Sequence, residues 1–450
     1  MSRIGDLARH GDATAAISAD GSRTSHAALA TLADSLAAGF PGVRGLGIIR
    51  CRNDLGTLAA YLAALRQGQV ALLAGAGTPD AQLATLAQTY QAEWLAQDGL
   101  ITSTGLRGGP IDPRAAVLLS TSGSTGSPKQ VVLSAANLDA NAAAIVEYLE
   151  IGPDERAITT LPFHYSYGLS VINSHLLAGA TLLLTDDALT TRPFWELCRR
   201  EVATSLAGVP TLYEMLARLR IERMDLPALR TLTQAGGRMD ADRVRHFAAI
   251  SRVRGWRFFV MYGQTEAAPR MAYLPPSLLP DHPDCIGVPI PGGSLRLVDA
   301  TGHVIDETDS EGELIFSGPN VMQGYASSRA DLSQLDPPAE LRTGDLAVRN
   351  AHGLYRVTGR LKRILKLHGH RVALDQLEQS LLAAGHEVIC GGRDDLLVVA
   401  HRPGADAQAI RSLVHRTCSV AQAELRCIAL DAWPTTGAGK IAYHRLAELA

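Results

Sequence analysis

The stretch Leu118-Leu-Ser-Thr-Ser-Gly-Ser-Thr-Gly-Ser-Pro-Lys129 is the most informative part of the sequence for the fold. It continues an apolar run, Ala115 to Leu119, whose length and flanks are typical of a buried strand. Its glycines allow backbone N–H groups to approach an anion, and its lysine adds a positive charge. Hydroxyl donors come from Ser120, Thr121, Ser122, Ser124 and Thr125. The glycines among them are Gly123 and Gly126, and Lys129 follows. The stretch therefore predicts a phosphate-binding loop.

This stretch has two other interpretations. The loop of the common NTPases has Gly, four residues, then Gly-Lys-Ser/Thr. Counted from Gly123, Pro128 stands at the second Gly position and Gln130 at the Ser/Thr position, so that pattern is not met. A surface linker rich in Ser and Gly remains the alternative for the stretch taken alone.

Length and composition indicate a multidomain chain. Its 450 residues are too many for one compact core of ordinary size, so we expect two or three structural units. A net charge of −3 gives no basic surface for nucleic acid or an anionic membrane, and no apolar run approaches the roughly 20 residues that cross a bilayer. The six cysteines lack metal spacing, and His368-Gly369-His370 has no nearby carboxylate, which favours a solvated turn. With no signal-peptide pattern, we expect a cytoplasmic protein without nucleic-acid or membrane partners.

Helical and strand patterns alternate along the first part of the chain. Expected helices are His26 to Ala38, Leu55 to Gln67 and Ser134 to Glu150, and expected strands are Gly45 to Arg50, Gln69 to Leu73 and Phe258 to Tyr262. This alternation predicts a parallel sheet covered by helices. Beyond Gly287, short β runs between Pro/Gly turns, such as Ser294 to Val298 and Gly312 to Ser317, predict a small β-rich subdomain.

Five motifs, in order, resemble those of the adenylate-forming superfamily, which includes acyl- and aryl-CoA synthetases, peptide-synthetase adenylation domains and firefly-type luciferases. They are Thr121 to Lys129, Tyr262-Gly263-Gln264-Thr265-Glu266, Thr343-Gly344-Asp345, Gly359-Arg360 and Pro434 to Lys440. The resemblance implies an α/β fold. Residues 1–360 would form a large N-terminal domain of parallel-sheet α/β subdomains plus the small β-rich subdomain, and residues 361–450 a small mobile α+β C-terminal lid.

The resemblance also implies roles in binding ATP and Mg²⁺. The implied catalytic residues are Lys129, Thr265, Glu266 and Lys440, with Glu266 holding the metal and Lys440 delivered by the lid. The implied nucleotide-binding residues are Ser120, Thr121, Ser122, Gly123, Ser124, Thr125, Gly126, Lys129, Gly236, Gly237, Tyr262, Gly263, Thr265, Asp345 and Arg360. Tyr262 would pack on adenine, Asp345 and Arg360 would lie near the ribose, and Lys362 would be the hinge.

The implied substrate pocket consists of His164, Tyr165, Tyr167, Val209, Gln234, Met261 and Met271. His164 stands one place before the family His, so that role is not transferred to it. The aromatic residues here either line a pocket for a flat or chain-like acid or fill the core. Gln234 to Gly237 could equally be a plain turn from strand to helix. Two further departures from the family are Gln376, where many relatives carry Glu, and Tyr443, where relatives usually carry Arg.

The function that the resemblance implies is ATP-dependent adenylation of a carboxylic acid with release of pyrophosphate. The acyl group would then pass to a thiol, either coenzyme A or the pantetheine of an acyl carrier protein. Two alternatives stay open: transfer to an amine or hydroxyl acceptor, and a non-catalytic protein that binds an adenine nucleotide. The residues do not identify the acid.

Overall fold

The computed structural model describes residues 2–120, 129–367, 370–394, 396–418, 425–435 and 441–449. The chain divides into two compact units. The first unit consists of Met1–Ser294 and Phe316–Leu341, and the second of Leu295–Ile315 and Arg342–Ala450. Both combine sheets with helices, as the sequence predicts. The domain boundary expected between residues 360 and 361 stays a prediction.

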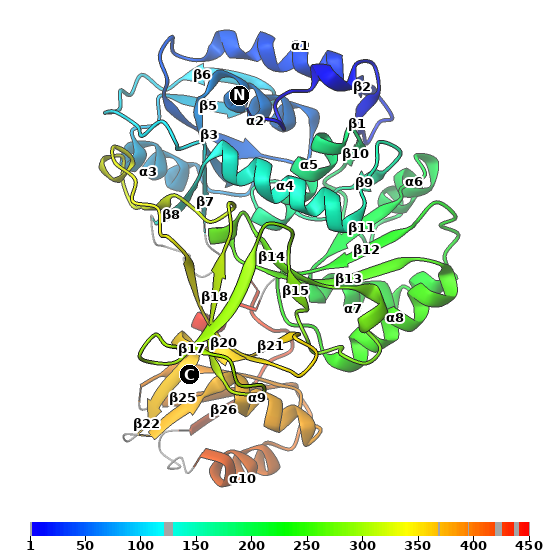
Figure 1. The fold of residues 1–450 in the computed structure, drawn as a ribbon, viewed down its shortest axis with the longest axis vertical. Helices are drawn as coiled ribbons and strands as arrows, with labels where there is room; N and C mark the ends of the chain where they lie inside the picture. The colour runs from blue at the N-terminus through cyan, green and yellow to red at the C-terminus, as the bar shows by residue number, and fades with distance from the viewer. Residues whose placement is uncertain are drawn as a thin grey trace. The chain divides into compact units, whose positions relative to one another are not determined.

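One sheet of the first unit is parallel in its centre and antiparallel at its edges (Figure 1). Its strands lie in the order β19 (Gly324–Ala326), β8 (Gln130–Leu133), β7 (Val117–Ser120), β4 (Val70–Gly75), β3 (Leu46–Cys51), β5 (Trp94–Gln97) and β6 (Leu100–Ser103). The pairs among β7, β4, β3 and β5 are parallel. The pairs β19–β8, β8–β7 and β5–β6 are antiparallel. The expected parallel arrangement thus holds in the centre, and hairpins add the outer strands.

The second sheet of this unit follows the same plan. Its order is β15 (Val288–Pro289), β14 (Arg270–Leu274), β13 (Arg257–Gly263), β12 (Thr231–Gln234), β11 (Ser205–Gly208), β9 (Arg156–Ile158), β10 (Thr181–Leu184), β1 (Thr14–Ser18) and β2 (Arg23–Ser25). The strands from β13 to β1 are parallel, while β14, β15 and β2 are antiparallel additions. Because β11, β12 and β13 pair in parallel, their carboxyl ends share one edge, where ligands bind in open α/β sheets.

Several helices of the first unit begin at side chains that satisfy their first N–H groups. The helices are α1 (His26–Leu36), α2 (Leu55–Gln67), α3 (Asp80–Tyr90), α4 (Ala135–Leu149), α5 (Ser166–Ala178), α6 (Arg192–Arg200), α7 (Pro210–Arg218) and α8 (Ala241–Arg254). Ser25, Asp54, Ser134 and Asp240 accept from backbone N–H groups at the starts of α1, α2, α4 and α8. The helix expected over Leu55 to Gln67 has those bounds, and Gly68 ends it in the left-handed region.

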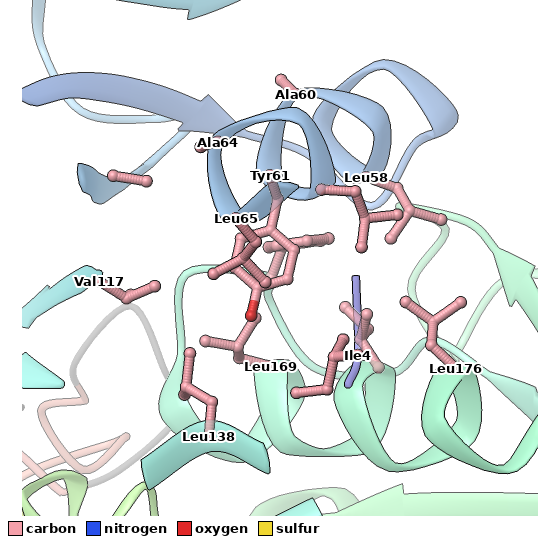
Figure 2. Packing of buried hydrophobic residues seen from close by; sticks show 14 of the residues in the cluster. Ile4, Leu58, Ala60, Tyr61, Ala64, Leu65, Val117, Leu138, Leu169 and Leu176 are labelled. Carbon is pink, nitrogen blue, oxygen red and sulfur yellow. The ribbon is translucent and has the colours of Figure 1, made fainter. Parts of the chain in front are cut away.

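Helix α2 lies at the centre of the main apolar core. Every residue from Thr57 to Leu65 is buried, so this helix contacts other elements on all sides. Figure 2 shows Tyr61 extending from α2 towards Leu169 of α5 and Leu138 of α4. The Tyr61 hydroxyl donates to Asn173 Oδ1 of α5 at 3.0 Å, which satisfies a polar group inside the core.

The second unit contains the β-rich part that the sequence predicts and the end of the chain. Its five-stranded sheet has the order β17 (Val304–Ile305), β16 (Ser294–Val298), β18 (Gly312–Ser317), β20 (Leu341–Arg349) and β21 (Tyr355–Arg360). A hairpin of β22 (Ile364–Leu367) and β23 (His370–Ala373) follows, and then α9 (Leu374–Ala383), β24 (Val388–Arg393), β25 (Leu396–His401), α10 (Ala407–Cys418) and β26 (Leu425–Ala429). Residues of both helices and all five of these strands share one apolar cluster. This is the α+β arrangement expected for the C-terminal part.

No helix within the described ranges is both long and apolar enough to cross a bilayer.

Gly47 of β3 lies where a larger residue has no room. A Cβ atom placed there would come within 1.9 Å of the ring of Trp94, its partner on the buried strand β5. Gly47→Ala should therefore lower the free energy of unfolding by roughly 1–3 kcal/mol, the usual cost of overpacking. The urea midpoint of unfolding should fall accordingly. Gly42→Ala is the matched control, because a Cβ there meets no atom within 4 Å. Equal midpoints for the two variants, followed by circular dichroism, would contradict this account of the β3–β5 contact.

Candidate active site

The predicted phosphate loop connects two strands that pair with each other. Ser120 ends β7 and pairs with Gln130 at the start of β8, and the Ser120 hydroxyl donates to Gln130 Oε1 at 2.9 Å. The loop therefore leaves and re-enters the sheet at one point. The expected loop residues Thr121, Ser122, Gly123, Ser124, Thr125 and Gly126 lie outside the described residues.

Lys129, predicted to bind phosphate, and Glu266, predicted to hold the metal, contact the same side chain. Lys129 is exposed, and its Nζ lies 3.6 Å from the centre of the Tyr325 ring. The Tyr325 hydroxyl donates to Glu266 Oε1 at 2.9 Å. Burial and the neighbouring carboxylate of Glu266 raise the pKa of Tyr325, so the phenol keeps its proton and remains a donor. One tyrosine thus contacts both groups: the lysine cation lies over its ring, and its hydroxyl donates to the carboxylate.

Tyr325 was not predicted from the sequence. It lies on the three-residue strand β19, which pairs with β8 so that Tyr325 is opposite Val131. Because Val131 is two residues beyond Lys129, this pairing brings the ring beneath the lysine. A tyrosine that follows a glycine in a region of turns carries no signal of its own, and only the strand pairing reveals its place.

The turn that carries Glu266 is held from outside its own sequence. Glu266 belongs to the short 3-10 helix η4 (Thr265–Ala267), and its backbone oxygen accepts from Met322 N at 2.8 Å. The buried Asn320 side chain donates to the backbone oxygens of Ala267, at 2.6 Å, and Arg270, at 2.9 Å. Residues 320–325 therefore fix the backbone of this turn and also supply the tyrosine that orients Glu266.

The remaining nucleotide residues expected in this unit follow the carboxyl ends of neighbouring strands. Buried Gln234 ends β12, and its Nε2 donates to the backbone oxygen of Gly237 at 2.8 Å. Gly236 between them has φ +85°, a conformation that favours glycine. Tyr262 and Gly263 end β13, the next strand, and a Cβ at Gly263 would lie 1.9 Å from the Pro269 oxygen. These positions share the sheet edge at which β11 and β12 also end.

Thr265 is linked to the first turn of α5. The hydroxyls of Ser166 and Thr265 are 3.1 Å apart. Tyr167 follows on the same helix and is fully buried, and its hydroxyl donates to the Thr233 backbone oxygen at 2.9 Å. The rings of Tyr165 and Tyr167 are 6.3 Å apart. The start of α5 therefore contributes a hydroxyl beside Thr265 and, with its N-cap Tyr165, two buried aromatic rings.

The other predicted pocket residues do not all lie beside Thr265 and the start of α5. His164 contacts Gly75 at the end of β4, where a Cβ would come within 2.8 Å of its ring, and burial lowers the pKa of this imidazole. Val209 is buried at the start of α7, and Met271 is buried in β14. Met261 is buried in β13, where its sulfur accepts from the Tyr148 hydroxyl at 3.0 Å.

Asp345 and Arg360 lie together in the second unit. They are opposite each other on β20 and β21, and Arg360 Nε is 2.6 Å from Asp345 Oδ1. Asp345 is buried, and its backbone N–H donates to the Thr343 hydroxyl at 3.0 Å. The structure thus places these two residues side by side and shows the aspartate held by its own motif.

The predicted hinge lies in a short helix, and the described residues that flank the predicted lid lysine in sequence pair with each other. Lys362 belongs to the helix η7 (Leu361–Arg363), but its side chain is outside the described part of the chain. Lys440 also lies outside the described residues. On either side of it, Thr435 and Ile441 form a β-bridge, and Ala442 N donates to the Pro434 oxygen at 2.7 Å.

Comparisons with known proteins find similarity to one class of enzyme over part of the chain. Residues 106–326 match a family model described as AMP-binding enzyme. The chain is 30% identical to a feruloyl-CoA synthase of Amycolatopsis sp over 59% of this chain and 53% of the relative. It is 29% identical to an indoleacetate–CoA ligase of Aromatoleum aromaticum over 77% of this chain and 70% of the relative. The match thus spans about half the length of the feruloyl-CoA synthase.

A solved structure has the same fold over nearly the whole chain. It is the o-succinylbenzoate CoA synthetase of Bacillus subtilis in complex with its acyl-adenylate intermediate, with a TM-score of 0.78 and 19% sequence identity. The similarity covers 98% of this chain and 97% of that chain. It confirms the expected fold class.

Asn320→Ala should destabilise the first unit. The variant removes the side-chain donor from the Ala267 carbonyl and one of two amide donors from the Arg270 carbonyl, to which Asn141 also donates; an unpaired buried carbonyl costs about 1–3 kcal/mol. Urea denaturation should show a loss of this size, whereas Gln82→Ala, an amide lost from the exposed face of α3, should change the free energy of unfolding by about 0.5 kcal/mol or less. Similar losses for both variants would mean that Asn320 does not hold the turn.

Proposed function

Because residues 106–326 match the family model of AMP-binding enzymes, we propose that this chain is an adenylate-forming enzyme that activates a carboxylic acid with ATP. A carboxylate oxygen attacks the α-phosphorus, pyrophosphate leaves, and an acyl adenylate forms. The sulfur of a thiol then attacks the acyl carbon, AMP leaves, and the product is a thioester. The net reaction is that of an AMP-forming acid–thiol ligase.

The first step brings two anions together, so the protein has to supply positive charge and fixed geometry. The observation that carries the proposal is the meeting of Lys129 and Glu266 at Tyr325. Lys129 would neutralise the departing pyrophosphate, together with N–H groups of the adjacent loop. Such preorganised charge is the largest contribution to catalysis in many enzymes. No side-chain nucleophile is needed.

The residues present fit Mg²⁺ bound through the nucleotide. Mg²⁺ is usually held by one or two carboxylates together with substrate phosphates and water. Across the described ranges, no three His, Cys, Asp or Glu side chains gather as a metal site, and Glu266 provides a single carboxylate oriented by Tyr325. Glu266 would hold the ion, which supplies charge to the phosphates. Tyr325 would keep the carboxylate pointed at it.

Residues of several motifs would bind the nucleoside. Tyr262 would pack on adenine, and the Gly236-Gly237 backbone, with Gly236 in the left-handed region, would lie against it. Buried Asp345 would accept from the ribose hydroxyls while Arg360 fixes its carboxylate. Lys440 would enter with the terminal loop, between the carboxylate and the α-phosphate, and withdraw before the second step.

The acceptor proposed is a thiol, either coenzyme A or the pantetheine of a carrier protein. The CoA-dependent names of two relatives support this choice. An amine or hydroxyl acceptor would leave the first step unchanged. Product masses from incubations with coenzyme A, a pantetheinylated carrier protein or amines would separate these acceptors.

Glu266→Gln should reduce acid-dependent ATP–pyrophosphate exchange by about 10²–10³, because one preorganised charge is lost. The assay would use a panel of short, long and aromatic acids. Glu196→Gln, on the exposed surface of α6, is the matched control and should retain full exchange. Release of phosphate without an acid, or full exchange in Glu266→Gln, would refute the proposed reaction.

Lys440→Ala should separate the two steps. Adenylate formation should fall by about 10²–10³ through loss of the transition-state charge, while thioester formation from a supplied acyl adenylate stays close to that of the natural protein. Arg445→Ala removes an exposed cation nearby on the same terminal segment and serves as the control. An equal fall in both steps would exclude a lysine that acts in the first step alone.

A further inference from the structure

Arg270 is a buried cation that the reaction described above does not use. It is 2% exposed, at the start of β14, four residues after Glu266. Within the described ranges no carboxylate lies within ion-pair distance of its guanidinium, and its Nε has no hydrogen-bond partner. A buried charge without a counterion is costly, because burial removes the water that would solvate it.

A bulge decides which way Arg270 points. Tyr262 pairs with Ala272, but the next residue, Gly263, pairs with Arg270, so Met271 is passed over in the register. Strict alternation would place residues 270 and 273 on opposite faces of the sheet. The bulge instead places them on the same face, and bulges near active sites commonly redirect a side chain in this way.

Tyrosines surround the guanidinium on that face. Its centre lies 3.9 Å from the centre of the Tyr167 ring on α5. Tyr148 of α4 stacks on Tyr273. The positive charge of Arg270 lowers the pKa of both Tyr148 and Tyr165. Burial raises the pKa of Tyr148, Tyr165 and Tyr167, that of Tyr148 to about 12, and the charge of Arg270 offsets only part of the rise. These phenols are therefore neutral, and none of them is the missing anion.

A small cavity borders Arg270 on the same face. Residues of α4, α5, β9, β11 and β12 enclose about 20 Å³ there, the volume of roughly one water probe. Glu155 also lines the cavity, but its carboxylate lies 3.5 Å from the guanidinium of Arg230, with which it forms an ion pair. His175 also lines it, and burial lowers the pKa of its imidazole, which keeps it neutral. The carboxylate that lines this cavity is thus already paired with another arginine and does not neutralise Arg270.

The position of Arg270 relates it to the proposed acid. Its partner Gly263 begins the turn that carries Thr265 and Glu266, and Tyr167 is adjacent to Ser166, whose hydroxyl is 3.1 Å from that of Thr265. The guanidinium is therefore buried against the ring of Tyr167, next to the helix turn that contacts Thr265. A group that reached it would be the end of the acid remote from the reacting carboxyl.

We propose that Arg270 determines substrate choice by binding a second, non-reacting oxygen function, a carboxylate or a phenolic hydroxyl, at the far end of the acid. The inference rests on the proposed acid activation. The ligand oxygen supplies an acceptor for Nε, which has none in the described structure, and a charge partner that the neutral tyrosines cannot supply. Binding requires the tyrosine side chains to shift so that the acid reaches the cavity. An unsubstituted acid leaves the cation unpaired and is therefore disfavoured.

Matched acids test this assignment. Benzoate is compared with 4-hydroxybenzoate and benzene-1,4-dicarboxylate, and hexanoate with hexanedioate, by kcat/KM in ATP–pyrophosphate exchange. The natural protein should prefer the oxygen-bearing member of at least one pair. Arg270→Met should reduce that preference at least about tenfold while changing kcat/KM for the plain acid little, and Arg270→Lys should retain part of it. Arg257→Met, which removes a cation paired with exposed Glu150 on the neighbouring strand, should leave the preference unchanged.

Stability and direct binding complete the test. Replacing an unpaired buried charge by a hydrophobic side chain should leave the melting temperature unchanged or raise it. A melting temperature of Arg270→Met clearly below that of Arg257→Met would assign Arg270 to the core and overturn the proposal. Equal losses for plain and oxygen-bearing acids, or no preference in the natural protein, would also overturn it.

Binding of the acids alone, measured by calorimetry, distinguishes failure of this inference from failure of the proposed function. If no acid supports exchange but an oxygen-bearing acid binds the natural protein more tightly than Arg270→Met, the acid site stands and the reaction is wrong. If exchange proceeds with full selectivity in Arg270→Met, the reaction stands and the role of Arg270 is wrong.

Discussion

The hydrogen bonds of Asn320 are the constraint on which the rest of this site depends. One buried amide holds two carbonyls of the turn between β13 and β14, and the backbone of Met322 holds a third. The same segment then pairs with β8 and places Tyr325 between Lys129 and Glu266. A charged side chain is useful in catalysis only if its position is fixed, and here the fixing groups come from a part of the chain remote from the turn.

Two buried charges, one in each unit, illustrate opposite solutions to the same problem. Asp345 is buried with its counterion, since Arg360 lies 2.6 Å away on the paired strand. Arg270 is buried among neutral phenols with no counterion in the described structure. The first arrangement is electrostatically complete and suits the role proposed for Asp345, which is to accept from neutral ribose hydroxyls. The second is incomplete, and an incomplete electrostatic environment is what a selective binding site for an anion requires.

Much of the fold could be read from the sequence, because local patterns determine it. The helix at Leu55–Gln67 has its cap at Asp54 and its stop at Gly68, and the neighbourhood of Asp345 and Arg360 follows from two adjacent motifs. The sequence could not supply Tyr325 and Asn320, whose positions depend on a strand pairing between distant segments. Nor could it supply the direction of Arg270, because a one-residue bulge reverses the alternation on which such a prediction relies.

The first unit is built from two separate segments of the chain, and this affects its folding during translation. Its sheet edge at β8 is complete only when Gly324–Ala326 has been synthesised, after the chain has already begun the second unit. At ribosomal rates of about 5–20 residues per second, that edge stays open for on the order of tens of seconds. An unpaired edge is a site of unwanted association between nascent chains. The protein therefore has a vulnerable period during translation that ends when the strand bearing Tyr325 arrives.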